Sequence, residues 1–287
     1  MSELKTQEKD GLKAFFARED VRKKFEEMLG KRAPQFITSV LQIASSNSLL
    51  KNAEPLSIYN AAAVAATLDL PLNNSLGFAW IVPFSGKAQF QIGWKGLVQL
   101  AQRTGQYKRI NVVEVYANQF EEWNSLTEEL VADFTIEGKG DIVGYCAYFQ
   151  LLNGFEKYVY WSRERVLSHG RKYSKTFSNG PWKTDENAMC KKTVLKNALS
   201  QWGILSIEMQ NAFKADQAVV TNAETLDVEY TDAPEEPTKE QERVTLMIED
   251  ATDLTQLAKL EEYITTPQQK ELFEQKAETI KKKGNGK

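Results

Sequence analysis

The chain has 287 residues, enough for one large domain and a smaller one, and its apolar content is ordinary for a globular protein. No run approaches the ~20 apolar residues that a membrane helix requires, and the N-terminal segment lacks the apolar stretch of a secretory signal. Cys146 and Cys190 belong to no CxxC pair. These features favour a cytoplasmic protein with two reduced thiols and no membrane partner.

The overall charge of −3 conceals two regions of opposite sign. Residues 204–287 carry 10 Lys and Arg against 18 Asp and Glu, a net charge of −8, whereas residues 1–203 carry 26 against 21, a net charge of +5. Within residues 155–203 there are ten basic and four acidic side chains. This pattern predicts a body that binds a polyanion, joined to an acidic tail.

The first third of the chain is predicted to be helical. An apolar face repeats at helical spacing before Gly30, and Pro34 suits the first turn of the next helix. Ser57 is expected to cap an alanine-rich helix that ends before Pro71. These helices are expected to supply packing or subunit contacts.

Residues 77–105 carry the most informative pattern. Two apolar runs flank Ser85-Gly86, which is typical of a tight hairpin turn, and an amphipathic helix begins at Trp94. The polar faces of the hairpin and the helix hold scattered cations, with no acid between Asp69 and Glu114. We therefore expect this surface to meet an anion.

The middle of the chain is predicted to be mostly β. Asn153-Gly154, between two apolar runs, is the strongest hairpin signal. Antiparallel hairpins or a meander packed with helices are expected, which is an α+β fold. The predicted strands are 110–120, 130–136, 143–152 and 155–161.

Helix is predicted again from residue 162. Ser162 is expected to cap a short helix closed by Gly170, and residues 171–183 are expected to form an exposed loop. Asp185 is expected to cap a helix that runs to the next glycine, and a short helix follows Ser206.

Three regions are predicted along the chain. Residues 1–217 would form the core, residues 218–238 an acidic flexible linker, and residues 239–287 a small three-helix module for protein partners. Capping-box patterns beginning at Thr238, Asp253 and Thr266 mark the three helices of that module.

The runs GFAWIVPF and AQFQIGWKGL, and the segment from Gly180-Pro181-Trp182 to Ala198, resemble the RecT family over roughly residues 30–217. These are phage-type single-strand annealing proteins of homologous recombination, more distantly similar to phage Redβ. The resemblance implies an ATP-independent recombinase that anneals complementary strands, with single-stranded DNA and annealed duplex as its partners, as a ring or helical filament in the cytoplasm of a bacterial host. It also implies that the tail recruits a companion exonuclease or the host single-strand-binding protein.

Two stretches supply candidate DNA-binding residues. Residues 171–183 interleave cations with aromatic rings, and the next helix places three lysines within an arc of about 140°. The polar faces of the hairpin and helix at 87–109 are expected to form a second wall of the DNA-binding groove, on the basis of their charge. Polar faces on hairpins are common in other proteins too. Phe90 and Trp94 are expected to lie in the core rather than to stack on bases. By position, the motifs at 93–97 and 180–182 with Lys191-Lys192 match the family, and the resemblance implies that they flank a DNA groove. The predicted DNA-binding residues are Lys87, Gln91, Lys95, Arg103, Lys108, Arg109, Arg171, Lys172, Lys175, Trp182, Lys183, Lys191, Lys192 and Lys196.

Nothing in the sequence indicates an enzyme. There is no GxxxxGK[ST] motif for nucleotide phosphates, and His169 is the only histidine. We therefore expect no catalytic residue and no cofactor, with Mg²⁺ at most a modulator of DNA binding. A passive single-strand-protecting protein, an adaptor that acts through its tail, and a metal-dependent nuclease are the alternatives. The carboxylates that a nuclease would use are Glu114, Glu121, Glu122 and Asp133, which solvated strand ends explain better.

Overall fold

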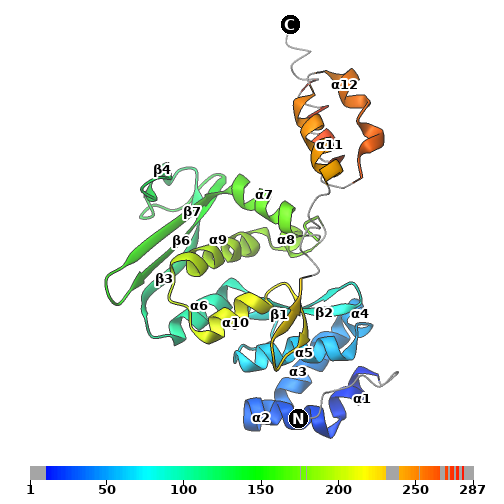
Figure 1. The fold of residues 1–287 in the computed structure, drawn as a ribbon. Helices are drawn as coiled ribbons and strands as arrows, with labels where there is room; N and C mark the ends of the chain where they lie inside the picture. Colours follow the sequence, from blue (N-terminus) through cyan, green and yellow to red (C-terminus); the bar gives the residue numbers. More distant parts are fainter. Residues whose placement is uncertain are drawn as a thin grey trace. The chain divides into compact units, whose positions relative to one another are not determined.

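The protein folds as two compact units, residues 1–233 and residues 234–287, which we describe separately. Helices and antiparallel sheets make up the first unit, so the predicted α+β class is confirmed (Figure 1). None of the helices in the described ranges is long and apolar enough to span a bilayer. The computed structural model describes residues 11–174, 176–178, 180–230, 239–251, 253–265, 269–270, 272–274, 276–277 and 280.

The N-terminal third is helical, as predicted. Gly30 ends the second helix with a φ of +56°, and Pro34 lies in the first turn of the third. Phe16 and Phe25 stack with ring centroids 6.1 Å apart, and Tyr59 packs edge-on against Phe25. The elements are α1 (Leu12–Ala17), α2 (Glu19–Leu29), η1 (Gly30–Arg32), α3 (Ala33–Ser46), α4 (Ser48–Lys51) and α5 (Pro55–Thr67).

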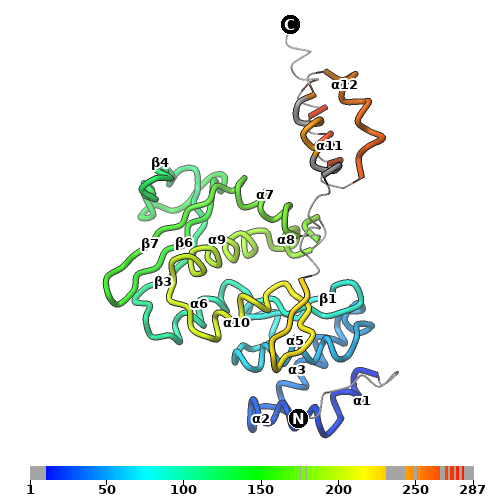
Figure 2. The backbone as a smooth tube through the Cα atoms, viewed as in Figure 1, coloured from blue at the N-terminus to red at the C-terminus, as the bar shows by residue number. Residues whose placement is uncertain are grey.

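The prediction that Ser57 caps α5 is wrong. The helix begins at Pro55, which suits a first turn because it lacks an N–H. The Ser57 hydroxyl instead donates to the Glu54 carbonyl and accepts from the Ala88 N–H, so it ties α5 to the following hairpin. The alanines of α5 are buried on all sides, and the backbone trace shows this helix between α2 and two hairpins (Figure 2).

The first hairpin is confirmed: β1 (Ala79–Phe84) pairs antiparallel with β2 (Lys87–Ile92). Both turn residues have positive φ, +47° at Ser85 and +77° at Gly86, as a two-residue hairpin turn requires. Helix α6 (Trp94–Arg103) follows. A Cβ at Gly93 or Gly96 would collide with the backbone of residues 77–78, so these glycines let the chain before β1 lie against the start of α6.

The main sheet has the strand order β3-β6-β7, all antiparallel: β3 (Tyr107–Tyr116), β6 (Ile142–Leu151) and β7 (Glu156–Ser162). The hairpin at Asn153-Gly154 is confirmed, with a φ of +91° at Gly154. The strand predicted over 110–120 ends at Tyr116. A separate hairpin, β4 (Phe120–Asn124) with β5 (Glu129–Ala132), packs Phe120 and Trp123 against Tyr160 on the sheet.

Four helices follow the sheet: α7 (Arg163–Tyr173), α8 (Pro181–Thr184), α9 (Glu186–Trp202) and α10 (Ile207–Ala215). The three predicted caps are confirmed, because Ser162, Asp185 and Ser206 accept from the backbone N–H of Arg165, Ala188 and Met209. Helix α9 packs along the sheet, against β6, β7 and β3 (Figure 1).

The prediction that Gly170 closes α7 is wrong. The helix continues to Tyr173, and a Cβ at Gly170 would lie 2.8–2.9 Å from the rings of Trp182 and Phe177. Glycine is needed here because α8 packs onto the helix. Residues 171–183 are consequently only partly loop, and Trp182 is buried within them.

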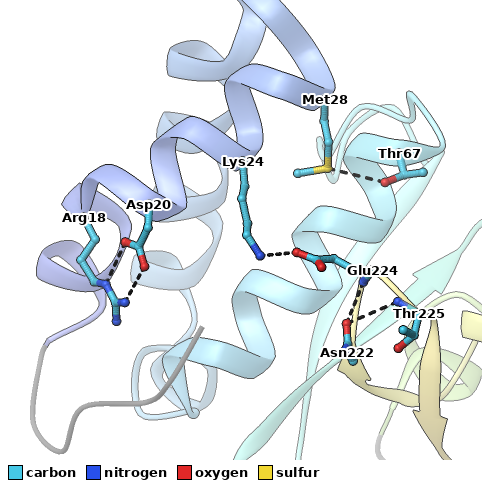
Figure 3. Close-up of polar contacts among 8 residues, drawn as sticks. All are labelled: Arg18, Asp20, Lys24, Met28, Thr67, Asn222, Glu224 and Thr225. Carbon is cyan, nitrogen blue, oxygen red and sulfur yellow. Dashed lines mark hydrogen bonds and ion pairs between the residues drawn. The ribbon is translucent and has the colours of Figure 1, made fainter. Parts of the chain in front are cut away.

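The linker predicted over 218–238 is also wrong for residues 218–230. They form the hairpin β8 (Val219–Asn222) with β9 (Asp227–Glu229), because Val219 and Val220 are buried despite the acidic surroundings. Glu224 at its turn pairs with Lys24 on α2, and the Asn222 side chain accepts from the turn N–H groups (Figure 3). The rest of the predicted linker, residues 231–238, lies outside the described residues.

The second unit is helical in its described part, with α11 (Lys239–Asp250), α12 (Leu254–Ala258) and η2 (Glu261–Tyr263). Asp253 caps α12 as predicted, by accepting from the N–H of Thr255 and Gln256. The predicted caps Thr238 and Thr266 lie outside the described residues, and the third predicted helix is only partly described. Residues of that segment pack against the unit's buried core: Leu272, Phe273, Ala277 and Ile280.

Candidate nucleic-acid interface

The N-terminal half of α9 meets the start of α6 through a shared aromatic ring. The Nζ of Lys191 lies 5.5 Å from the centroid of Trp94, and the Nζ of Lys95 lies 5.8 Å from it. Lys191 is also paired with Glu114 on β3, at 2.7 Å. The structure thus brings together two predicted cations, Lys95 and Lys191, from stretches almost a hundred residues apart.

A buried ion group lies one turn further along α9. Asp216, at the end of α10, has a fully buried carboxylate that accepts from Lys192 at 2.8 Å, from Lys196 at 2.7 Å and from the Ile92 N–H at 3.1 Å. Burial acts to raise the pKa of Asp216, but the charges and hydrogen bonds of the two lysines hold that pKa below its usual value. One carboxylate thus serves two lysines. Burial lowers the pKa of Lys192, as does the charge of Lys196, whereas the charge of Asp216 opposes that shift.

Lys192 belongs to the interior. It is 5% exposed, and its Nζ is committed to Asp216. Lys196 is more accessible, because about a third of its side chain reaches the surface. The three lysines that were predicted to share one face of the helix therefore have different surroundings. Lys191 faces α6, Lys192 is internal, and Lys196 borders α7.

A cavity of about 350 Å³ opens beside this ion group. It lies where α7, α8 and α9 meet the turn that follows α10. The His169 ring is 4.6 Å from the Tyr173 ring and 5.5 Å from the Trp161 ring, so three aromatic residues line one side. The lining includes Trp161, His169, Tyr173, Trp182, Lys196 and Gln217.

The pKa of His169 indicates that the cavity has a positive electrostatic potential. Burial lowers the pKa of His169 below its ordinary value, and the charges of Lys196, Lys172 and Arg165 lower it further. His169 is therefore neutral near pH 7, in a strongly positive surrounding. A negatively charged ligand would be favoured there.

Exposed cations on α7 and α8 are next in sequence to residues that line the cavity. Lys172 lies over the Tyr173 ring at 5.2 Å, and Arg171 lies over the Phe177 ring at 5.5 Å. Lys183 is exposed on α8, and the predicted Lys175 lies outside the described residues. We call the group formed by these side chains the α7–α9 surface: Arg171, Lys172, Lys183, Lys196, His169 and Tyr173.

Sequence reasoning missed part of this surface. Arg165 stacks over Trp161 at 4.2 Å, and neither residue was among the predicted site residues. The spacing of Arg165, His169 and Lys172 repeats every three to four residues, which places them on one helical face. This face was recognised only in part, because the helix was expected to end at Gly170, before Lys172.

Apart from Lys95, the predicted residues of the second wall have their known contacts elsewhere in the described part of the chain. Lys87 is paired with Glu229 at 3.2 Å, and Gln91 is half-buried on β2. Arg103 donates to the backbone carbonyls of residues 68 and 69, so it fastens the turn after α5. Lys108 and Arg109 are exposed at the start of β3, beside the β6–β7 turn and at the opposite end of the sheet from α7.

The carboxylates weighed for a nuclease do not converge. Glu114 is paired with Lys191, and Asp133 accepts from the Thr135 hydroxyl at 2.5 Å. Within the described ranges, no three His, Cys, Asp or Glu side chains are grouped as a metal ion would require.

Comparison with known proteins places this geometry in a class. The chain matches the RecT family over residues 34–235. It is 51% identical over 201 residues to the uncharacterized protein YqaK of Bacillus subtilis (strain 168), covering 70% of each chain. It is 28% identical over 207 residues to protein RecT of Escherichia coli (strain K12), covering 67% of this chain and 76% of that protein.

These matches define a recombination protein of the single-strand annealing class. The chain belongs to the RecT family.

Proposed function

We propose that this protein is an ATP-independent recombinase that coats single-stranded DNA and anneals it to a complementary strand, working as a ring or helical filament. The observation that carries the proposal is the α7–α9 surface, where exposed cations and aromatic rings gather within the stretch that matches the RecT family. Single-stranded DNA needs both kinds of group, cations for phosphates and planar rings for bases.

The chemistry of such a reaction needs no nucleotide hydrolysis. Base pairing itself drives the joining of two complementary strands, so the protein has to neutralise phosphate charge and hold the first strand extended. Lys172 and Lys183 are exposed for phosphate contacts, and Lys196 has a partly exposed side chain beside the cavity. Lys95 and Lys191, on the other side of α9, would continue the track toward α6.

The remaining predicted residues take different parts in this proposal. Lys192, Trp182 and Arg103 support the fold around the track, because each is buried or bonded to the backbone. Lys87, Gln91, Lys108 and Arg109 would contact DNA held by a neighbouring copy in a ring or filament. Head-to-tail contacts of that kind need not close, so one groove could run across many subunits.

The acidic tail unit fits protein partners better than DNA. We propose that it recruits a companion exonuclease or the host single-strand-binding protein, because phosphate would be repelled by its net negative charge. The cytoplasm of the bacterial host is the compartment in which this work would occur.

Annealing kinetics without ATP test the proposal. Two complementary oligonucleotides, one with a fluorophore and one with a quencher, are mixed with and without the protein. We expect faster pairing with protein present and intact strands after incubation with Mg²⁺ or Mn²⁺. Slower pairing would favour a passive strand-protecting protein, and shortening of labelled DNA would favour a nuclease.

A further inference from the structure

One residue that lines the cavity between α7, α8 and α9 has a buried polar atom without a hydrogen-bond partner in the described part of the chain. Trp182 is 5% exposed, and its Nε1 has no hydrogen-bond partner among the described residues. A buried N–H without a partner is destabilising, and such groups are rare in folded proteins. Trp182 lines the cavity, but its Nε1 is closed off from solvent, so the indole has to shift before this donor can reach a ligand that brings an acceptor.

The walls of the cavity suit a planar ligand. The rings of Trp161, His169 and Tyr173 lie next to one another along one side, with centroids 4.6 to 5.5 Å apart. A volume of about 350 Å³ is at the lower end of small-molecule pockets and is large enough for one nucleoside. Every nucleobase has a π face, so stacking here would be tolerant of sequence.

The polar groups around the cavity are rich in donors. Lys196 and the Trp182 Nε1 can only donate, and the nearby carboxylate of Asp216 is already occupied by two lysines and a backbone N–H. Charged groups that bring donors of their own would therefore be disfavoured. A base carbonyl and a phosphate oxygen are acceptors that match this set.

We propose that this cavity receives a single base of the bound DNA strand, turned out of the backbone track. The base lies against the Tyr173 and His169 rings, and Lys196 contacts the adjoining phosphate. The indole of Trp182 shifts so that its Nε1 donates to an acceptor on the edge of the base. The inference rests on the proposed DNA binding and adds a base-holding position to it. A base held there leaves its neighbours free to meet a complementary strand.

The test compares two ligands of equal charge: an oligothymidylate, and a phosphodiester oligomer of the same length whose sugars carry no base. Full-length protein is titrated with each, and the ratio of the two affinities measures the energy gained from bases. Ser200→Trp places a large side chain on the cavity lining, at a residue that is exposed on α9. Gln201→Trp is the matched control, because that neighbouring exposed residue does not line the cavity.

We expect wild-type protein and Gln201→Trp to prefer the oligothymidylate. In Ser200→Trp the ratio of the two affinities should fall about tenfold, which is the effect of losing one stacked base. Trp182→Phe keeps an aromatic ring without the N–H, and a reduction of about threefold to tenfold is expected. A preference that is equal in all four proteins would overturn the inference while leaving DNA binding intact. Failure of wild-type protein to bind either oligomer would overturn the proposed function itself.

Photocrosslinking gives a positional check. An oligonucleotide containing 5-iododeoxyuridine is irradiated in complex with wild-type protein, and the modified peptides are mapped by mass spectrometry. Attachment at Trp161, His169, Tyr173 or Trp182 supports the inference. Attachment only at residues outside the cavity would contradict it. Free thymidine monophosphate is added as competitor, and loss of these crosslinks at low concentration would show that the cavity prefers a free nucleotide to a base within a strand.

Discussion

At the scale of single residues, Asp216 organises the region between α9, α10 and β2. Its carboxylate is fully buried and joins Lys192, Lys196 and the backbone of Ile92. Buried ion groups of this kind contribute little net stability compared with apolar packing, but the loss of one partner leaves uncompensated charge in the interior. The position of Lys196 beside the cavity therefore depends on a residue that does not face DNA.

Asp216→Ala should destabilise the protein strongly, by about 3–5 kcal/mol, because Lys192 would remain buried without a counter-charge. Thermal unfolding at a fixed protein concentration measures the effect. Glu137→Ala is the control, since the Glu137–Lys139 pair is almost fully exposed and should contribute little. Equal unfolding midpoints for Asp216→Ala and wild-type protein would contradict this role.

The pKa of His169 gives a second prediction at this scale. Burial and the positive charges of Lys196, Lys172 and Arg165 lower that pKa in the folded state, so the unfolded chain binds a proton more readily. Stability from neutral His169 is therefore present at pH 7.5 and is lost as the pH falls below about 6.5. Because this is the only histidine, its proton resonances can be followed by NMR without assignment. A titration midpoint at or above 6.5 would contradict the prediction, and His169→Gln should unfold with less dependence on pH in this range.

At the scale of elements, close packing of α8 on α7 shapes the α7–α9 surface. The indole of Trp182 lies against the backbone of Gly170, where no side chain fits. The same contact carries α7 one turn further than local sequence suggests, and it places Lys172 and Tyr173 on the helix rather than in a loop.

Gly170→Ala should destabilise the protein by about 1–3 kcal/mol, although alanine is the better helix former, because the new methyl group overlaps two aromatic rings. Urea unfolding measures the change. Gly11→Ala, where nothing lies within 4 Å of the added group, is the control and should be close to neutral. A Gly170→Ala protein as stable as wild type would mean that α8 packs differently.

Local signals in the sequence predicted local structure well. Ser162, Asp185 and Ser206 cap their helices because capping depends on residues two or three positions away. Gly170 was misread because its neighbour across the interface, Trp182, is twelve positions further on. The hairpin at 218–230 was missed because two buried valines outweigh the acidic composition. The charge of Lys192 was visible, but its burial depends on Asp216, which no local pattern indicates.

At the scale of the whole molecule, the change in charge along the chain precedes the boundary between the two folding units. Residues 1–203 carry a net charge of +5, but residues 204–233, which complete the first unit, carry six acidic side chains against one lysine. The second unit has a core of its own, formed by Val244, Ile248, Ala251 and Leu257. The two units therefore have separate cores.

Deletion of residues 239–287 should leave single-stranded DNA binding and annealing intact in vitro, and remove only the proposed recruitment of protein partners. Fluorescence anisotropy and the annealing assay measure both activities in the truncated and full-length proteins. A truncated protein that folds but no longer binds DNA would show that the tail, rather than the α7–α9 surface, is the main functional part.

The salt dependence of single-stranded DNA affinity tests the central claim most directly. Lys172→Glu with Lys183→Glu reverses two exposed charges on the α7–α9 surface, and Lys31→Glu with Lys51→Glu makes the same change on the N-terminal helices. Each lost phosphate contact should reduce the slope of log affinity against log salt by about 0.7. We predict a slope about 1.4 smaller for the first pair, and a slope close to that of wild type for the second. Equal slopes for the two double variants would contradict the assignment of the α7–α9 surface as the site where the strand binds.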